Sequence, residues 1–227
     1  MAEDGTKATP RRKRGPADPL SKERIVAAAL DLVDREGLDA LSMRRLGKEL
    51  GVDPMAIYYY VPNKSALYDG IMDVVLGGLA EMEFEPDTSL EEFFVRAGCA
   101  YRDVLLRHRR ALPLLTGRSL RTEHTLMLAE LMIGRLAAEG VPLAEATAAL
   151  NSFSYYVAGA VNAHSREELA SEYHEGTSPE DMAAMLPAEH FPHVLRSIAE
   201  NAWMDDEREF EFMLRVIARG FVASKGS

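Results

Sequence analysis

The residues of this chain whose types best suit direct chemistry gather within its first 70 positions, where they could contact phosphates and bases. Arg44 can offer a bidentate guanidinium to guanine, and Lys64 can place a positive charge beside a phosphate. Between them stand three consecutive tyrosines, Tyr58, Tyr59 and Tyr60. Three neighbouring side chains of a helix cannot all point inward, so some of these phenols must be exposed. An exposed phenol can hydrogen-bond a phosphate and contact a thymine methyl group, which indicates double-stranded DNA as a partner.

Enzymatic and metal chemistry finds little support in the sequence. His190 and His193 have the spacing of a metal-ligand pair, but Pro192 lies between them and no third ligand is indicated. There is no nucleophile motif, phosphate-binding loop or dinucleotide fingerprint. We therefore expect no enzyme activity, no metal and no cofactor, and keep an enzyme only as a less favoured alternative.

The net charge of −10 argues at first against a nucleic-acid partner, so the distribution of charge matters more than its sum. The first 70 residues contain 12 basic and 11 acidic side chains, whereas the remainder contains 14 basic and 25 acidic ones. A DNA-binding head would therefore have to gather its cations on one face.

Residues 1–19 are rich in Pro, Gly, Lys and Arg and have almost no apolar side chains, which predicts a mobile basic arm. Its cations, Arg11, Arg12, Lys13 and Arg14, either stay solvated or lie along DNA. No apolar stretch follows them as in a secretory signal, and no apolar run reaches the roughly 18 residues of a membrane span. We expect a cytoplasmic protein without a membrane partner.

Helix signals follow one another along the whole chain. Capping residues and helix breakers predict four helices in the first part, within 21–37, 42–51, 53–61 and 63–82. Further helices are predicted at 90–108, 122–139, 143–164 and 207–222, with a short element around Leu114 and Leu115 after Pro113. Prolines at 179, 187 and 192 predict a long, partly helical loop over 165–205.

No strand alternation is sustained, so the expected fold is all-α. We expect a flexible arm over 1–19, a three-helix helix-turn-helix DNA-binding domain over 20–68, and a helical ligand-binding and dimerisation domain over 69–227. The turn at Gly51 and Val52 is on its own weak evidence, because a plain three-helix bundle also contains such turns.

The sequence resembles the TetR family of bacterial regulators. The similarity lies in Ile25–Val33, Gly37–Leu41, Leu46–Val52 and Tyr58–Leu67. It implies that DNA is contacted by the residues that open the second helix, by those along the third, and by the lysine that opens the fourth. Carried over by position, these residues are Ser42, Met43, Arg44, Pro54, Met55, Ala56, Tyr58, Tyr59, Tyr60 and Lys64. Positions 54 to 56 have no hydrogen-bonding side chain, so we expect base readout from Arg44.

The last two long helices are candidates for a dimer interface. Small residues recur at helical spacing and would permit close helix approach: Ala144, Ala148, Ser152, Gly159 and Ala163. With the helix at 207–222 they would build a four-helix bundle between two subunits, as the resemblance also implies. Alternatively, the small-residue face packs inside one subunit.

The predicted ligand-binding and dimerisation domain, here called the body, resembles that of the tetracycline-sensing repressors of this family. It differs from them at the drug site. Leu115 replaces the histidine that binds the drug's magnesium, and Ala80, Ala97 and Ala163 replace polar drug contacts. A magnesium–tetracycline complex is therefore not the expected effector. We expect a mainly apolar cavity lined by Phe94, Tyr101, Leu115, Phe153 and Tyr156, with Arg118 or His164 as a polar anchor.

The expected function is a ligand-responsive transcriptional repressor. It would bind a palindromic operator as a homodimer and be released by a small, largely apolar effector, with the fourth helix as the mechanical link. The alternatives are a ligand-independent or activating DNA-binding regulator and, less favoured, a helical protein-interaction module or an enzyme.

Overall fold

The computed structural model describes residues 19–117, 122–173, 179–200 and 206–223, and these ranges fold into helices without strands. The predicted all-α class is confirmed. The helices are α1 (Lys22–Glu36), α2 (Met43–Leu50), α3 (Pro54–Tyr60), α4 (Lys64–Ala80), α5 (Leu90–Arg107), α6 (Leu112–Gly117), α7 (Glu123–Ala138), α8 (Leu143–Tyr173), α9 (Pro179–Met185), α10 (Pro192–Ala199) and α11 (Asp206–Ala223), with the short 3₁₀ turns η1 (Leu38–Ala40) and η2 (Arg109–Ala111).

Each of the first four helices begins at the capping residue that the sequence predicts. The side-chain oxygen of each cap accepts a hydrogen bond from a backbone N–H of the first turn. The caps are Ser21, Ser42, Asp53 and Asn63, with N···O distances of 3.2, 3.1, 2.8 and 2.8 Å. Gly51 ends α2 at φ = 70°, a left-handed conformation that glycine adopts without steric cost.

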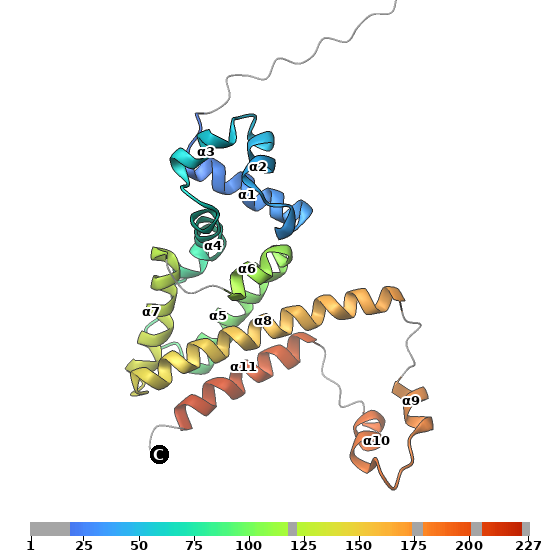
Figure 1. The fold of residues 1–227 in the computed structure, drawn as a ribbon. Coiled ribbons are helices and arrows are strands. Elements are labelled where there is room, and N and C mark those ends of the chain that lie inside the picture. Colours follow the sequence, from blue (N-terminus) through green and yellow to red (C-terminus); the bar gives the residue numbers. More distant parts are fainter. Residues whose placement is uncertain (1–18, 118–121, 174–178, 201–205, 224–227) are drawn as a thin grey trace, which may run out of the picture.

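Helices α1, α2 and α3 form a head at one end of the molecule, and α4 runs from this head into the body (Figure 1). The head has its own core, in which Ile25, Leu46, Ile57 and Leu67 are fully buried. Further along, α4 packs against α5 and α7. One helix therefore belongs to the packing of both parts.

In the body, α5 is the central helix and packs against α4, α8 and α11. Phe93 and Phe94 of α5 are buried, and the ring of Phe94 meets the ring of Phe153 of α8 edge to face at 5.4 Å. Helices α8 and α11 lie side by side along one flank of the body (Figure 1). This flank is the one that the sequence assigns to dimerisation.

The segment predicted as a partly helical loop over 165–205 contains more helix than expected. Helix α8 continues to Tyr173 rather than ending at His164, and α9 and α10 follow it. Both of these short helices begin at a proline, Pro179 and Pro192, because the first helical position needs no backbone N–H. The sequence prediction treated these prolines as helix breakers, whereas in the structure they are helix starts.

None of the helices in the described part of the chain is both long enough and apolar enough to cross a bilayer.

Gly98 allows α5 and α11 to approach closely, which gives a stability prediction. A Cβ atom added there would lie 2.5 and 2.8 Å from the methyl carbons of Leu214. We expect Gly98→Ala to lower the free energy of unfolding by about 1–3 kcal/mol in urea titrations at fixed protein concentration. Gly134→Ala on α7 is the control, because a Cβ atom there meets nothing within 4 Å. Equal stability of the two variants would contradict the close packing.

Candidate DNA interface and effector cavity

The turn between α2 and α3 holds α3 as an outward-facing helix. The backbone N–H of Val52 donates to the carbonyl of Gly47 at 2.9 Å, and Ile57 is fully buried. A Cβ atom at Gly47 would lie 3.0 Å from the carbonyl oxygen of Val52, so α2 and the turn are closely packed at this junction. Anchored in this way, α3 exposes Met55 and its three tyrosines to solvent.

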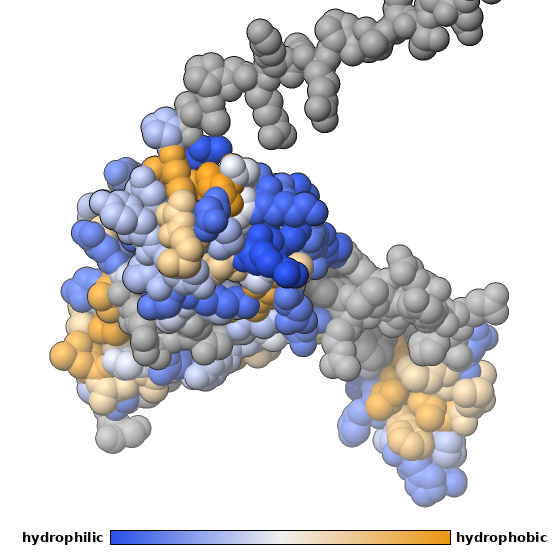
Figure 2. Space-filling model, turned by 45° about the horizontal axis from the view of Figure 1, so that its top comes forward, coloured by the Kyte–Doolittle hydropathy of each residue, from blue (hydrophilic) through white to orange (hydrophobic). Residues whose placement is uncertain are grey.

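The exposed face of α3 is apolar and aromatic rather than charged. Met55 is 72% exposed and Tyr59 is 87% exposed, while Tyr58 and Tyr60 are each 40% exposed. The rings of Tyr59 and Tyr60 meet edge to face at 5.2 Å, which restricts both phenols. In Figure 2 the head shows exposed hydrophobic atoms within a mostly hydrophilic surface.

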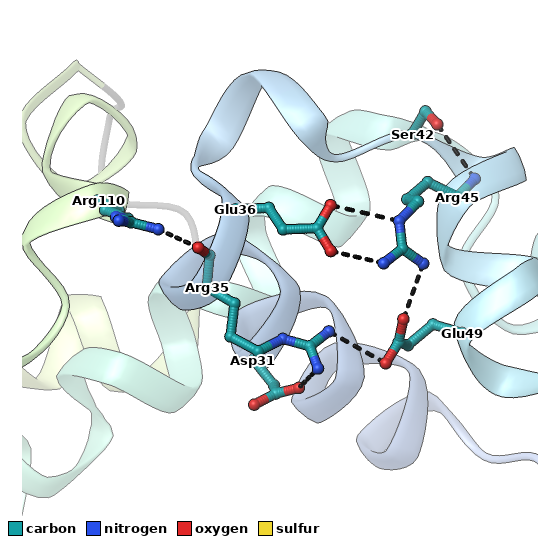
Figure 3. A network of polar contacts seen from close by, with 7 residues as sticks. All are labelled: Asp31, Arg35, Glu36, Ser42, Arg45, Glu49 and Arg110. Carbon is teal, nitrogen blue, oxygen red and sulfur yellow. Dashed lines mark hydrogen bonds and ion pairs between the residues drawn. The ribbon is translucent and has the colours of Figure 1, made fainter.

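Two adjacent arginines of α2 have different environments. Arg45 donates to Glu49 at 2.7 Å and to Glu36 at 2.5 Å, and these hydrogen bonds raise its pKa (Figure 3). The side chain of Arg44 is exposed and has no hydrogen bond or ion pair to any residue that the structure describes. Arg44 therefore remains available to an external partner, whereas Arg45 is occupied.

The network around Arg45 extends to the end of α1. Arg35 contacts Glu49 at 3.0 Å and Asp31 at 3.5 Å. Hydrogen bonds from Arg35 and Arg45 lower the pKa of Glu49, which keeps this carboxylate ionised. All of these pairs are exposed, so their role is to hold charges in place rather than to supply much stability.

The other residues expected at the DNA surface occupy mixed positions. Lys64 is exposed at the start of α4, with its Nζ 5.3 Å from the centroid of the Tyr68 ring. Ser42 is exposed, but its hydroxyl caps α2. Pro54 and Ala56 are half-buried. Met43 is not exposed, because its side chain packs into the core of the head.

The body touches the head at the end of α1 and supports α4 from the side. Nδ1 of His108, just after α5, lies 2.9 Å from the carboxylate of Asp34. Arg110 of η2 donates to the backbone carbonyl of Arg35 (Figure 3). On α4, the carboxylate of Asp73 lies 3.0 Å from Nδ1 of His124 at the start of α7. Through these contacts the body restrains the orientation of the head.

A cavity of about 640 Å³ opens among α5, α8 and α11. Its walls include Arg102, Leu106, Tyr155, Tyr156, Glu207 and Phe210. The rings of Tyr156 and Phe210 are stacked at 5.5 Å and 17°, and the hydroxyl of Tyr156 donates to the carbonyl of Phe210 at 3.3 Å. Burial raises the pKa of Tyr156 to about 12, so its hydroxyl stays protonated.

The expected effector residues are only partly brought together at this cavity. Tyr156 lines it, and so does Ala163. Phe94, Leu115, Phe153 and Tyr101 do not, because they are buried in the packed core of the body. Phe94 is surrounded by the rings of Phe93, Phe153 and Phe221. These rings occupy the space in which a ligand was expected. Arg118 and the side chain of His164 lie outside the described residues, as do the basic residues of the arm.

Sequence reasoning missed Arg102 and Phe210 as cavity residues and Asp73 and His124 as a pair. Arg102 follows Tyr101 in an amphipathic repeat and has no motif of its own. For Phe210 the sequence does contain a signal. The helix at 207–222 has more apolar residues than a single buried face requires, which indicates a second apolar contact surface. Contacts between residues 108 positions apart along the chain, such as Arg102 and Phe210, leave no local pattern.

The flank formed by α8 and α11 remains uncovered within one chain. Exposed apolar side chains on it are Leu143, Tyr155, Phe212 and Val216. The small residues predicted to permit helix approach, from Ala144 to Ala163, are all exposed as well. The alternative in which the small-residue face packs inside one subunit is therefore wrong.

The described residues contain no group of three or more His, Cys, Asp or Glu side chains that could hold a metal ion. His190 and His193 are both exposed.

A three-helix head with an outward-facing third helix, followed by a helical body, is the architecture of a helix-turn-helix transcription regulator. The family model for bacterial regulatory proteins of the tetR family matches residues 25–71, and the model for the tetracyclin repressor-like C-terminal domain matches residues 84–224. The chain belongs to the TetR family.

Relatives and solved structures agree with this membership. The class G tetracycline repressor of Vibrio anguillarum is 31% identical over 89% of this chain and 93% of its own. A helix-turn-helix regulator of Saccharopolyspora erythraea is 34% identical over 64% of this chain, a match that spans 61% of that regulator. The crystal structure of ActR from Streptomyces coelicolor in complex with actinorhodin has a TM-score of 0.75, at 28% identity and with 92% of this chain and all of that chain covered.

The Asp73–His124 contact predicts a pH dependence of stability. Asp73 raises the pKa of His124, so the folded protein favours the protonated imidazole. This stabilisation is complete below the unfolded pKa near 6.5 and is lost as the pH rises through the higher folded-state pKa. We expect Tm to fall as the pH rises above about 6.5, and His124→Gln to reduce that slope. His190→Gln, at an exposed position, should keep the wild-type slope, and an unchanged slope in His124→Gln would exclude this role.

Proposed function

We propose that this TetR-family regulator is a repressor that binds a palindromic operator as a homodimer and leaves it when a small-molecule effector binds the body. The single observation that carries the proposal is the exposed face of α3 beside the unoccupied Arg44. We expect it to act in the cytoplasm. As units we propose a basic arm (1–19), a DNA-binding head (20–68) and an effector-binding and dimerisation body (69–227).

At the operator, α3 would lie in the major groove with Arg44 reading a base. The tyrosine hydroxyls, Lys64 and the backbone at the start of α2 would contact phosphates, while Met55 and Ala56 would meet apolar base edges. The side chain of Met43 supports the head core and is left out of the contact set. The remaining proposed contacts are Ser42, Arg44, Pro54, Met55, Ala56, Tyr58, Tyr59, Tyr60 and Lys64.

Release would use α4 and the head–body contacts. An effector that favours a body arrangement in which the two heads no longer match the operator lowers DNA affinity by its coupling free energy. Two observations favour this mode over a ligand-independent regulator. The body has an open cavity of ligand size, and ActR, a similar structure, was solved in complex with actinorhodin.

Substitution of Arg44 tests the DNA assignment. Operator fragments are first selected from random DNA by the wild-type protein, and affinities are then measured by fluorescence anisotropy. We expect Arg44→Gln to weaken operator binding by about 1–3 kcal/mol, roughly 5- to 150-fold, with little effect on Tm. Arg45→Gln, its neighbour in the ion-pair network, should have a much smaller effect. If the two variants bind alike, Arg44 does not read the operator.

Substitution on the α8–α11 flank tests the dimer. Phe212→Glu places a charge at an exposed apolar position of α11, and we expect it to shift the protein to a monomer in sedimentation equilibrium at micromolar concentration. Leu126→Glu on α7, also exposed, should leave the dimer intact. A wild-type protein that sediments as a monomer would overturn the homodimer.

A further inference from the structure

From the contacts at the end of α1 we infer that His108 and Arg110 hold the head in one orientation relative to the body, and thereby set which spacing of operator half-sites the dimer accepts. This inference rests on the proposed function for its effect on DNA, whereas the restraint on the head depends on the contacts alone. Both residues lie between α5 and α6, His108 directly after α5 and Arg110 in η2.

Helix α1 of the head is attached to the rest of the chain at two places along its length (Figure 1). Near its start, Val26 lies so close to α4 that a Cβ atom at Gly70 would be 2.7 Å from a methyl carbon of Val26. Near its end, Asp34 and Arg35 contact the segment between α5 and α6. At a rise of about 1.5 Å per residue, Val26 and Asp34 are roughly 12 Å apart along the helix axis. A head held by α4 alone could turn about that helix, and the second attachment opposes such a turn.

The contact between His108 and Asp34 is partly buried. Nδ1 of the imidazole lies 2.9 Å from one carboxylate oxygen, and the two side chains are 22% and 29% exposed. The other carboxylate oxygen of Asp34 is buried and has no hydrogen-bond partner among the described residues. A small turn of the head would stretch the hydrogen bond to His108 while the carboxylate stayed partly buried, which costs free energy. The contact therefore favours one orientation of α1.

Arg110 caps the end of α1 from outside the head. The last four carbonyl groups of a helix have no partner within that helix. The N–H of Gly37 donates to the carbonyl of Val33 at 2.8 Å, and the guanidinium of Arg110 donates to the carbonyl of Arg35 (Figure 3). The helix dipole also favours a cation at this end. Part of the cap of a head helix is therefore supplied by the body.

The segment that supplies these two side chains is itself anchored in the body. Ala111 is fully buried next to Arg110, and Leu114 and Leu115 of the following α6 are also buried. The η2 turn packs against α1, α5 and α6, and α6 packs in turn against α4 and α8. The contacts at the end of α1 therefore connect the head to packed helices of the body.

The spacing of the half-sites depends directly on the orientation of the two heads. Helix α1 packs against α2, and α2 packs against α3, so the proposed DNA contacts move together with α1. Half-sites lie about 34–36 Å or 10–10.5 base pairs apart, so one added base pair shifts a half-site by about 3.4 Å and rotates it by about 35°. Heads in a fixed orientation cannot follow this change without losing contacts. We therefore expect His108 and Arg110 to determine how strictly the spacing is read.

Distances between head and body test the restraint without DNA. Spin labels are attached through Lys48→Cys in α2 and Glu130→Cys in α7, both at exposed positions, in a Cys99→Ala background. Labelled chains are diluted with unlabelled ones, and distances are measured by pulsed electron paramagnetic resonance. We expect His108→Ala and Arg110→Ala each to broaden the distance distribution.

Arg107→Ala is the matched control, because Arg107 is also exposed but donates to the carbonyl of Asp103 within α5 rather than to the head. Arg110 is exposed, so Arg110→Ala should keep the wild-type Tm and remain folded even if His108→Ala is destabilised. An unchanged distribution in Arg110→Ala, or the same broadening in Arg107→Ala, would overturn the inference.

Operators of altered spacing test the effect on DNA. The selected operator is compared by fluorescence anisotropy with versions that have one base pair more or one fewer between the half-sites. We expect wild type to bind the altered versions at least about tenfold more weakly, and Arg110→Ala to reduce this ratio at least about threefold. An unchanged ratio, or an equal loss of affinity for all three DNAs, would overturn the role in spacing. If wild type selects no operator, the proposed function fails, while the spin-label distances still decide whether the two residues restrain the head.

Discussion

Helix α4 contributes buried side chains to two packing regions, and the relation between head and body depends on this. Leu67 and Ile71 are fully buried toward the head, while Leu76 and Leu79 are buried further along toward the body. Close packing makes such a helix stiff, because its side chains cannot shift on one side without disturbing the other. Gly70 sharpens the fit, since a Cβ atom there would lie 2.7 Å from a methyl carbon of Val26 in α1. If the body rearranges, this packing favours a movement of the whole helix over a local adjustment, as the proposed release from DNA requires.

The head has no large excess of positive charge, and several of its acidic side chains form ion pairs with its own arginines. The first 70 residues carry almost equal numbers of acidic and basic side chains, so the head gains no general attraction for DNA. Ion pairs engage Glu36 and Glu49 with Arg45 and Arg35, which ties these carboxylates to cations of their own domain. Arg44 in the first turn of α2 and Lys64 at the start of α4 have no such carboxylate among the described residues, and both are exposed. A head of nearly zero net charge can therefore still offer two unpaired cationic side chains to a phosphate backbone.

The aromatic residues of the body fall into two groups: some are packed in the core, and others line the cavity. Phe93, Phe153 and Phe221 pack around Phe94 in the core, whereas the stacked rings of Tyr156 and Phe210 belong to residues that line the cavity. The difference lies in the neighbouring small residues of α8, since Gly159, Ala160 and Ala163 leave room that larger side chains would occupy. The same helix therefore supplies both a packed segment and a recess.

The sequence by itself determined the all-α class, the caps and limits of α1 to α4, and the outward-facing tyrosines. These follow from residue types a few positions apart, and capping and helical periodicity act over just that range. Tertiary structure decided which arginine of the pair at 44 and 45 is free, because Glu36 and Glu49 approach Arg45 from different helices. It also decided that Pro179 and Pro192 start helices, and that Arg102 and Phe210, rather than Phe94 and Phe153, form the cavity. Burial and cavities depend on side chains brought together from distant segments, and no local pattern encodes which of several apolar residues will meet a neighbour and which will face a gap.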